Sequence, residues 1–449
     1  MSDEQEIERK HDTGYSEEEM QSTLKKVTFS SFLGNFIEWF DYASYSYLAT
    51  VISLVFFPDE DPTVAVMSTF GVFALAFLVR PIGAFFWGSL GDKKGRKWAL
   101  SISILLMSGA TFLIGCLPGY AMIGIGAPLL LLLLRMVQSF SASGEYAGAS
   151  TFIAEYAPKE HRGFYCSMVP ASTAAGLLVG SLLATLMYTI FGAESTFMMS
   201  WGWRIPFWMA GPLGLITHYI RTHLEDSPVY ESMQEALGAQ TAEVAHPIKT
   251  LFTKHLRVLL ISFGACMLNA VGFYAVLTYL PNYLETTLGY DAALSSTITT
   301  ITLVVYIFLI FLSGRISDKF GRKRMLITAC VGFIVLTVPA FMLLNTMNFW
   351  VILITEIVMC AVLTINDGTL ASYLTETFPT NVRYSGFALS FNFANAIFGG
   401  SASYISMWLI QLTGNNLAPA WYMVVIAAIA LVAMILSHEH TGKDLTEVE

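Results

Sequence analysis

The sequence predicts an all-α membrane protein in which twelve transmembrane helices form two pseudo-symmetric six-helix bundles. Three observations lead to this fold class: a low charge content, twelve long apolar segments and an internal repeat. Only 13% of the 449 residues are charged and 55% are hydrophobic, whereas about 25% of the residues of a soluble domain are charged. So few charges cannot cover a soluble protein of this size. The composition therefore excludes a nucleic-acid-binding protein, a secreted disulfide-rich domain and a disordered adaptor.

Twelve apolar segments are long enough to cross about 30 Å of hydrocarbon as α-helices. Several exceed the minimum of about 20 residues, which indicates tilt or extension beyond the bilayer. We expect these helices at residues 27–57, 67–90, 98–117, 123–157, 164–191, 203–223, 257–284, 293–316, 324–344, 350–378, 384–411 and 418–437.

The basic residues predict how these helices are oriented. Every second connection carries Lys or Arg, and the alternate connections contain neither. Because basic residues are concentrated in cytosolic loops, we expect both termini in the cytosol and the protein in the inner (plasma) membrane. The predicted organisation is a cytosolic tail at 1–26, a six-helix bundle at 27–223, a cytosolic linker at 224–256, a second six-helix bundle at 257–437 and a cytosolic tail at 438–449.

The sequence offers no basis for covalent or metal chemistry. The five cysteines lie within or beside apolar segments without a CxxC pair, so we expect buried structural thiols. The chain has no HExxH motif, no phosphate-binding loop and no Ser-His-Asp arrangement. We therefore expect no enzyme, no metal, no cofactor, no nucleic acid and no obligate protein partner.

Two loop motifs occur twice, in the same order. Segment 88–97, GSLGDKKGRK, recurs at 314–323 as GRISDKFGRK, at an offset of 226. The pattern Glu-x-x-Pro-x-x-x-Arg at 155–162 recurs at 376–383, at an offset of 221. Two motifs at nearly the same offset indicate parallel six-helix repeats.

The repeated loops suggest a latch between the two halves. Asp92 and Asp318 can face the positive start of a helix, which by pseudo-symmetry lies near Tyr384 and Gly163. We hypothesise that these contacts join the halves on the cytosolic side when the cavity opens outward; the alternative is that the loops only determine topology. The latch residues are Gly88, Asp92, Gly95, Arg96, Glu155, Arg162, Gly314, Asp318, Gly321, Arg322, Glu376 and Arg383.

The repeated Gly-x-x-x-Asp-Lys-x-Gly-Arg-Lys loop resembles the signature of the major facilitator superfamily. Segments 35–42, 144–149, 203–207 and 278–284 resemble its metabolite:proton symporter branch. Within that branch the sequence is most similar to the proline/glycine-betaine (osmoprotectant) proton symporters. The resemblance implies a major facilitator fold, proton-coupled transport by alternating access, and a functional requirement for the helix-one acids and the helix-two Arg.

Ionisable residues inside predicted spans cost about 2.5–3.5 kcal/mol each on insertion scales, so each needs a partner or a function. We expect proton coupling at Asp41, Glu38 and Glu145. Glu38 and Asp41 either exchange protons or form static pairs with Arg80 and Arg135, and the two interpretations need not exclude each other. We expect Arg135 to pair with Glu145 or Glu38. The substrate-binding candidates are Arg80, Glu38, Trp39, Tyr42, Arg135, Gln138, Tyr279 and Asn392.

The buried charges also bear on the substrate. Two deep arginines against five acids disfavour a tricarboxylate and favour a zwitterion, with its carboxylate on Arg80 and its cationic end near acids and aromatic rings. Glu356 and Asp367 share one face of helix ten, and either form a second cation or proton site or face a wet crevice. We expect import of betaine or proline with a proton; the alternative is a mono- or dicarboxylate. The duplicated loop disfavours a channel or receptor.

Overall fold

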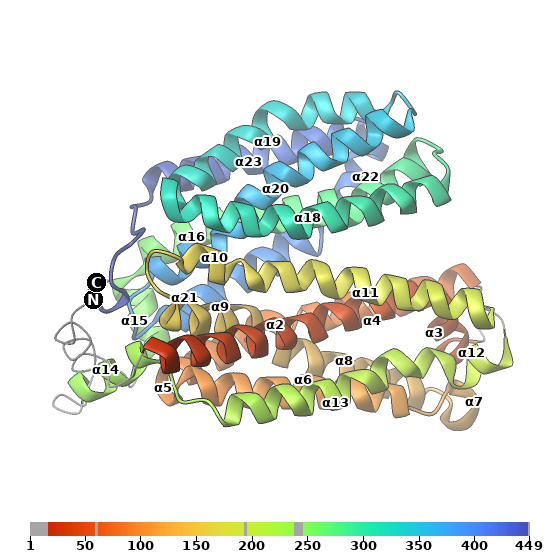
Figure 1. Cartoon of the computed structure of the whole chain (residues 1–449). Helices are drawn as coiled ribbons and strands as arrows, with labels where there is room; N and C mark the ends of the chain where they lie inside the picture. Colours follow the sequence, from red (N-terminus) through yellow and green to blue (C-terminus); the bar gives the residue numbers. More distant parts are fainter. Residues whose placement is uncertain (1–16, 59–61, 193–194, 238–245, 448–449) are drawn as a thin grey trace.

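The computed structural model describes residues 17–58, 62–192, 195–237 and 246–447, and the regular structure in these ranges is helical (Figure 1). The first bundle comprises α2 (Glu17–Tyr47), α3 (Ala49–Phe56), α4 (Pro62–Phe77), α5 (Arg80–Lys94), α6 (Arg96–Cys116), α7 (Tyr120–Ile123), α8 (Gly126–Ala142), α9 (Glu145–Tyr156), α10 (Arg162–Cys166), α11 (Met168–Phe191), α12 (Thr196–Ser200), η1 (Gly202–Arg204) and α13 (Ile205–Thr222).

The second bundle follows two connecting helices, α14 (Pro228–Leu237) and α15 (Pro247–Lys254). It comprises α16 (Leu256–Phe273), η2 (Tyr274–Tyr279), α17 (Leu280–Asn282), η3 (Tyr283–Thr287), α18 (Ala292–Phe320), α19 (Arg322–Leu344), α20 (Phe349–Thr377), α21 (Arg383–Ala394), η4 (Asn395–Gly399), α22 (Ala402–Thr413) and α23 (Ala418–Leu436), and a short turn, η5 (Leu445–Glu447), comes after it.

The predicted spans are recovered as helices, although not all are continuous. Within the described residues, eight helices are long and apolar enough to cross a membrane. The other four predicted spans correspond to α2–α3, α4–α5, α13 and α21–α22, which are interrupted or carry ionisable side chains. The outward-facing surface is apolar: Leu78, Phe308 and Trp421 are 67%, 70% and 54% exposed. Such a surface suits a lipid environment.

Two predicted boundaries differ from the structure. The first helix begins at Glu17 instead of residue 27, because the intervening Glu, Gln, Met and Lys residues are good helix formers. The rest of the predicted tail, residues 1–16, lies outside the described residues. The predicted linker 224–256 contains α14 and α15, and its residues 238–245 also lie outside the described ranges.

Several spans are broken near mid-membrane. Helix two is interrupted between Phe77 and Arg80, just before Pro81, which cannot donate a backbone hydrogen bond. Helix four is interrupted between Ala142 and Glu145. Helices seven and eleven contain the π-helical segments η2 and η4, and such segments occur often at functional sites. The irregular backbone thus gathers around the buried charges described below.

Helices one and five lie close together because glycines face the contact. A Cβ atom at Gly176 would lie 2.8 Å from the Phe36 carbonyl oxygen, and one at Gly180 would lie 2.9 Å from the Phe40 carbonyl oxygen. Small residues let membrane helices approach this closely.

In Figure 1, helices α18, α19, α20 and α23 of the second bundle lie together, as do α2, α6, α11 and α13 of the first. The start of α2, the helices α14 and α15 and the segment after α23 gather at one end. The repeated loops 92–97 and 318–324 belong to this end, which we call the basic end. Here α10 packs against α18 and α21 packs against α5, so the two bundles meet.

Candidate transport site and basic-end latch

Arg80 forms the centre of a buried polar cluster between the bundles. Its Nη2 donates to Glu38 Oε1 at 2.7 Å, its Nη1 to the Tyr42 hydroxyl at 3.1 Å and its Nε to Asn392 Oδ1 at 3.3 Å. Asn392 belongs to the second bundle, and its side-chain amide also donates to the Ser143 carbonyl. The guanidinium therefore joins helix one, helix two and helix eleven.

Aromatic rings surround this cluster. The Trp39 ring lies 5.6 Å from the Tyr42 ring and 5.2 Å from that of Phe273 in the second bundle. The Arg80 guanidinium lies 5.1 Å from the centre of the Phe77 ring. Within the described part of the chain, the second oxygen of Glu38, Oε2, is buried and has no hydrogen-bond partner. The cluster thus combines a guanidinium, an unused carboxylate oxygen and apolar ring faces.

A second buried ion pair joins Asp41 to Arg135. Arg135 Nη1 lies 2.5 Å from Asp41 Oδ2, and the Gln138 amide donates to the same oxygen at 2.6 Å. The guanidinium also lies 3.7 Å from the centre of the Tyr45 ring. The expectation that Arg135 pairs with Glu145 or Glu38 is therefore wrong. Glu145 lies ten residues, or about 15 Å, farther along helix four.

Glu145 pairs instead with Arg221 on α13. Both terminal nitrogens of Arg221 donate to the Glu145 carboxylate, and Nη1 also donates to the Leu100 carbonyl at 2.9 Å. Sequence analysis did not count Arg221 among the deep arginines, because it stands near the end of the predicted helix 203–223, but the side chain is fully buried. The set of arginines that pair with the predicted acids must therefore include Arg221: Arg80, Arg135 and Arg221 each pair with one of Glu38, Asp41 and Glu145.

The first repeated loop contacts the start of helix eleven in the other bundle. The Asp92 carboxylate accepts hydrogen bonds from the backbone N–H groups of Tyr384 and Ser385 at 3.1 and 2.9 Å, and from the Ser385 hydroxyl at 2.6 Å. This is the helix start that pseudo-symmetry predicts. Gly88 permits the approach, because a Cβ atom there would lie 2.7 Å from Ser385 Cα.

The second repeated loop makes the equivalent contact in the opposite direction. The Asp318 carboxylate accepts hydrogen bonds from the backbone N–H groups of Gly163 and Phe164 at 2.7 and 3.0 Å. A Cβ atom at Gly314 would lie 2.7 Å from the Gly163 carbonyl oxygen. Each bundle therefore places one carboxylate on a helix start of its partner.

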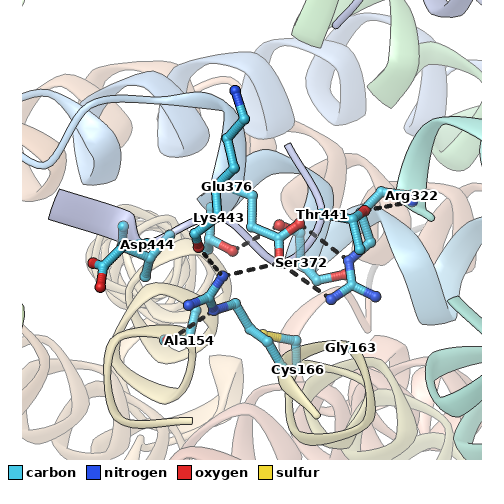
Figure 2. Close-up of polar contacts among 12 residues, drawn as sticks. Ala154, Gly163, Cys166, Arg322, Ser372, Glu376, Thr441, Lys443 and Asp444 are labelled. Atoms are coloured by element: carbon cyan, nitrogen blue, oxygen red, sulfur yellow. Dashed lines mark hydrogen bonds and ion pairs between the residues drawn. The ribbon is translucent and has the colours of Figure 1, made fainter. Parts of the chain in front are cut away.

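Ion pairs surround these two contacts. Glu155 Oε1 lies 3.1 Å from Arg96 Nη2 and 2.9 Å from Arg383 Nη1 of the other bundle. The equivalent acid, Glu376, pairs with Arg322 at 3.1 Å and with Arg162 of the other bundle at 3.2 Å. Figure 2 shows Glu376 beside Arg322.

The turns that carry these groups depend on glycine. Gly95 and Gly321 have φ values of 100° and 93°, which other residues rarely adopt. Next to Gly95, the Asp226 carboxylate accepts from the backbone N–H groups of Arg96 and Lys97. Burial raises the pKa of Asp226, although the charge of Arg96 and the backbone N–H groups of Ser227 and Lys97 act in the opposite direction.

The segment after α23 also takes part in these contacts, which sequence analysis did not foresee. The Leu445 carbonyl accepts from Arg383 Nη2 at 2.8 Å, and the Lys443 carbonyl accepts from Arg162 at 3.2 Å. Glu439 accepts from the backbone N–H groups of Arg322 and Lys323. These are mostly backbone acceptors, so no side-chain motif announces them. The predicted tail 438–449 is thus bound to both bundles over the residues that the structure describes.

The remaining predicted residues lie apart from the Arg80 cluster. The Tyr279 ring packs against Tyr283 at 6.0 Å. Glu356 and Asp367 are buried in the second bundle.

Cys116 is exposed at the end of α6, contrary to the predicted burial of all five thiols. In the described residues, no group of His, Cys, Asp and Glu could hold a metal ion.

The sequence profile of the Major Facilitator Superfamily matches residues 32–403 and 262–446. The chain belongs to the major facilitator superfamily. It is accordingly an integral membrane protein.

Curated relatives cover nearly all of this chain. It is 38% identical over 427 residues to the proline/betaine transporter of Salmonella typhimurium, and 38% identical to the glycine betaine/proline/ectoine/pipecolic acid transporter OusA of Dickeya dadantii. It is 37% identical to the proline/betaine transporter of Escherichia coli. Each match covers 94% of this chain and 85% of the relative.

Solved structures support the fold at lower identity. The proton:xylose symporter XylE bound to 6-bromo-6-deoxy-D-glucose matches with a TM-score of 0.76 at 19% identity, covering 95% of this chain and 98% of that one. The inward-open xylose transporter XylE from E. coli matches with a TM-score of 0.63 at 19% identity, covering 95% and 99%. The prediction of a major facilitator fold is confirmed.

Proposed function

We propose that this protein is a proton-coupled symporter, not an enzyme, which imports a small zwitterion such as glycine betaine or proline by alternating access. Relatives at 37–38% identity over nearly the whole chain are named for these solutes. The observation that carries the proposal is the Arg80 cluster, which places a guanidinium and an unused carboxylate oxygen beside aromatic rings.

The cluster suits the two ends of a zwitterion. The Arg80 fork can bind both oxygens of a carboxylate in exchange for its weaker contacts with Tyr42 and Asn392. The cationic end would lie near Glu38 Oε2 and against the faces of Trp39 and Tyr42. Because Asn392 belongs to the second bundle, replacing its contact by substrate would alter how the bundles are joined at mid-membrane.

Asp41 is our candidate for proton coupling. A proton that binds to the Asp41 carboxylate removes its charge and so weakens the ion pair with Arg135. The pair connects helices one and four, so its strength would change with the arrangement of the bundle. Moving one proton with a net-neutral zwitterion carries one charge inward, worth about 2.3 kcal/mol per 100 mV.

The charge balance does not favour an organic acid as the substrate. Although Arg221 adds a third buried arginine, Glu145 engages both of its terminal nitrogens. The three pairs Arg80–Glu38, Arg135–Asp41 and Arg221–Glu145 leave no excess positive charge for a di- or tricarboxylate.

For the orientation, we propose that the basic end faces the cytosol, since it carries the repeated basic loops. The bundles are joined there, so the structure would represent a state closed to the cytosol. The membrane would be the inner (plasma) membrane, and the partners of the protein would be the solute, the proton and the bilayer.

The test uses purified protein in liposomes. Wild-type protein should accumulate labelled betaine or proline when an inward proton gradient is imposed. Asp41→Asn should reduce gradient-driven accumulation while it retains exchange of labelled for unlabelled solute, because exchange requires no net proton movement. Wild-type uptake of carboxylates but not of zwitterions would contradict the substrate, and ohmic, non-saturating flux would contradict a carrier.

A further inference from the structure

The second bundle contains a buried polar cluster that the proposed transport site does not use. The Asp367 carboxylate on α20 accepts hydrogen bonds from the hydroxyl of Tyr306 on α18 and from the amide of Asn269 on α16. The three residues are 3%, 0% and 4% exposed. Three helices therefore converge on one carboxylate inside the bundle.

The internal repeat relates two residues of this cluster to Arg80 and Tyr146 of the first bundle. Tyr306 lies 226 positions after Arg80, which is the offset of the first loop motif. Asp367 lies 221 positions after Tyr146, which is the offset of the second motif. Helices eight and ten thus carry a hydroxyl and a carboxylate where helices two and four carry Arg80 and the Glu145-Tyr146 pair. The second bundle replaces the guanidinium with an uncharged donor.

Among the described residues, no basic group balances the charge of Asp367. The titratable groups that interact with it are uncharged hydroxyls and one thiol, which belong to Tyr306 on α18, Tyr146 on α9 and Cys360 on its own helix. The other buried acid of α20, Glu356, lies eleven residues, or about 16 Å, away along the helix. In the part of the chain that the structure describes, Asp367 contacts no Lys, Arg or His. An ionised, unpaired carboxylate at this depth is costly, and such groups are neutralised by taking up a proton.

The partners of Asp367 can accommodate both protonation states. The Tyr306 hydroxyl can donate to the carboxylate or accept from the carboxyl O–H. Asn269 donates to Asp367 and also to the side-chain oxygen of Asn366 at 3.2 Å. Uptake or release of a proton therefore leaves no buried polar atom of the cluster without a partner, so the site can titrate without repacking.

Asp367 also lies between the Arg80 site and the basic end. Asn269 is one helical turn, about 6 Å, from Phe273, which packs against Trp39 of the Arg80 site. In the other direction, Asp367 lies nine residues, or about 13 Å along α20, from Glu376, which pairs with Arg162 of the first bundle.

We propose that Asp367, held by Tyr306 and Asn269, is a second proton-binding site that loads and unloads during the transport cycle. The carboxylate binds a proton from the outer solution, and the carboxyl group releases it to the cytosol. This inference rests on the proposed function. It implies that two protons, one on Asp41 and one on Asp367, accompany each solute molecule.

The experiment measures proton and betaine fluxes together in proteoliposomes that contain a pH-sensitive dye, without a membrane potential. Each coupled proton contributes about tenfold accumulation per pH unit of gradient. Asp367→Asn should therefore reduce betaine accumulation about tenfold at a gradient of one pH unit and lower the ratio of protons to betaine from two to one. Betaine exchange should persist, which distinguishes this loss from misfolding.

Two comparison variants sharpen the result. Asp367→Glu keeps a titratable group and should retain a ratio of two, whereas Glu356→Gln removes the other buried acid of α20 and should also retain it. An unchanged ratio in Asp367→Asn, an equal loss in Glu356→Gln, or wild-type uptake driven by a Na⁺ gradient that requires Asp367 would overturn the proposal. A wild-type protein that neither exchanges nor accumulates betaine would instead overturn the proposed function.

Discussion

Three buried arginines of the first bundle, Arg80, Arg135 and Arg221, differ in what they can offer a ligand. Both terminal nitrogens of Arg221 are engaged by Glu145, and Arg135 is held by Asp41 and Gln138. Arg80 instead distributes its three nitrogens over three separate residues on two helices. A carboxylate can therefore bind to Arg80 while the Glu38 ion pair remains, which makes it the arginine best suited to exchange partners.

Arg80→Lys is expected to raise the KM for betaine at least tenfold. A lysine ammonium cannot present the planar fork that binds two carboxylate oxygens, and hydrogen bonds to charged groups contribute about 1.5–3 kcal/mol each. Initial uptake rates in proteoliposomes measure the effect. The matched control is Arg324→Lys, since Arg324 is exposed at the basic end and should leave KM unchanged. A normal KM in Arg80→Lys would show that the substrate does not need the guanidinium fork.

At the scale of single residues, the sequence indicates which charged side chains are buried better than it indicates which residues they pair with. Glu38, Asp41 and Arg80 are recognisable because they interrupt long apolar segments. The pairing of Arg135 with Asp41, 94 residues apart, depends on how helices one and four face each other. Arg221 was missed because it stands near the end of a predicted helix, and only its contact with Glu145 on another helix reveals its burial.

At the scale of helices, apolar length predicts where spans lie but not where they break. The irregularities at Arg80, at Glu145 and in η2 and η4 require the local hydrogen-bond pattern. Pro81 gives a sequence signal for one of them. For α2, the apolar segment alone places the start of the helix too late, because the helix also includes the polar residues that precede this segment.

Glycines on α5 determine how closely helix two approaches helix eleven. Gly88→Ala is expected to separate the bundles at the basic end, because its Cβ atom would lie 2.7 Å from the backbone of Ser385. Spin labels at the exposed positions of Lys94 and Lys319, with Cys116 replaced by Ser, should report a longer distance by electron resonance.

Gly109→Ala on α6 provides the control, because apart from the backbone of its own helix no atom lies within 4 Å of a Cβ atom added there. Alanine also favours the helical conformation over glycine by about 1 kcal/mol. This variant should keep the wild-type distance and unfold at an equal or higher temperature. An unaltered Lys94–Lys319 distance in Gly88→Ala would mean that the close contact does not hold the bundles together.

At the scale of the whole molecule, the repeat predicted the most about the structure. Asp92 and Asp318 contact the two helix starts that pseudo-symmetry indicates. Glu155 and Glu376 occupy equivalent positions beside them. The contacts of the segment after α23 with Arg162 and Arg383 could not be inferred, because they are made by carbonyl groups, which every residue has. Repeats reveal side-chain pairs, while backbone acceptors become visible only in three dimensions.

The latch hypothesis predicts that Asp92→Asn and Asp318→Asn each shift the protein toward a state open at the basic end. Each carboxylate accepts backbone hydrogen bonds at a helix start of the other bundle, where its charge is also favoured by the helix dipole. An amide of the same size keeps one acceptor oxygen but loses the charge, which costs about 1–2 kcal/mol. The open population should therefore rise about tenfold, as measured by the same Lys94–Lys319 spin-label pair.

Asp291→Asn is the matched control for this prediction. Asp291 also accepts a backbone hydrogen bond at a helix start, from Leu294 at 2.9 Å, but it does so within the second bundle and at the opposite end of α18. Its loss should affect only the local helix cap and leave the distance distribution unchanged. If Asp92→Asn and Asp318→Asn behave like Asp291→Asn, the repeated loops set topology without latching the bundles, and the ion pairs of Glu155 and Glu376 would have to hold the basic end closed.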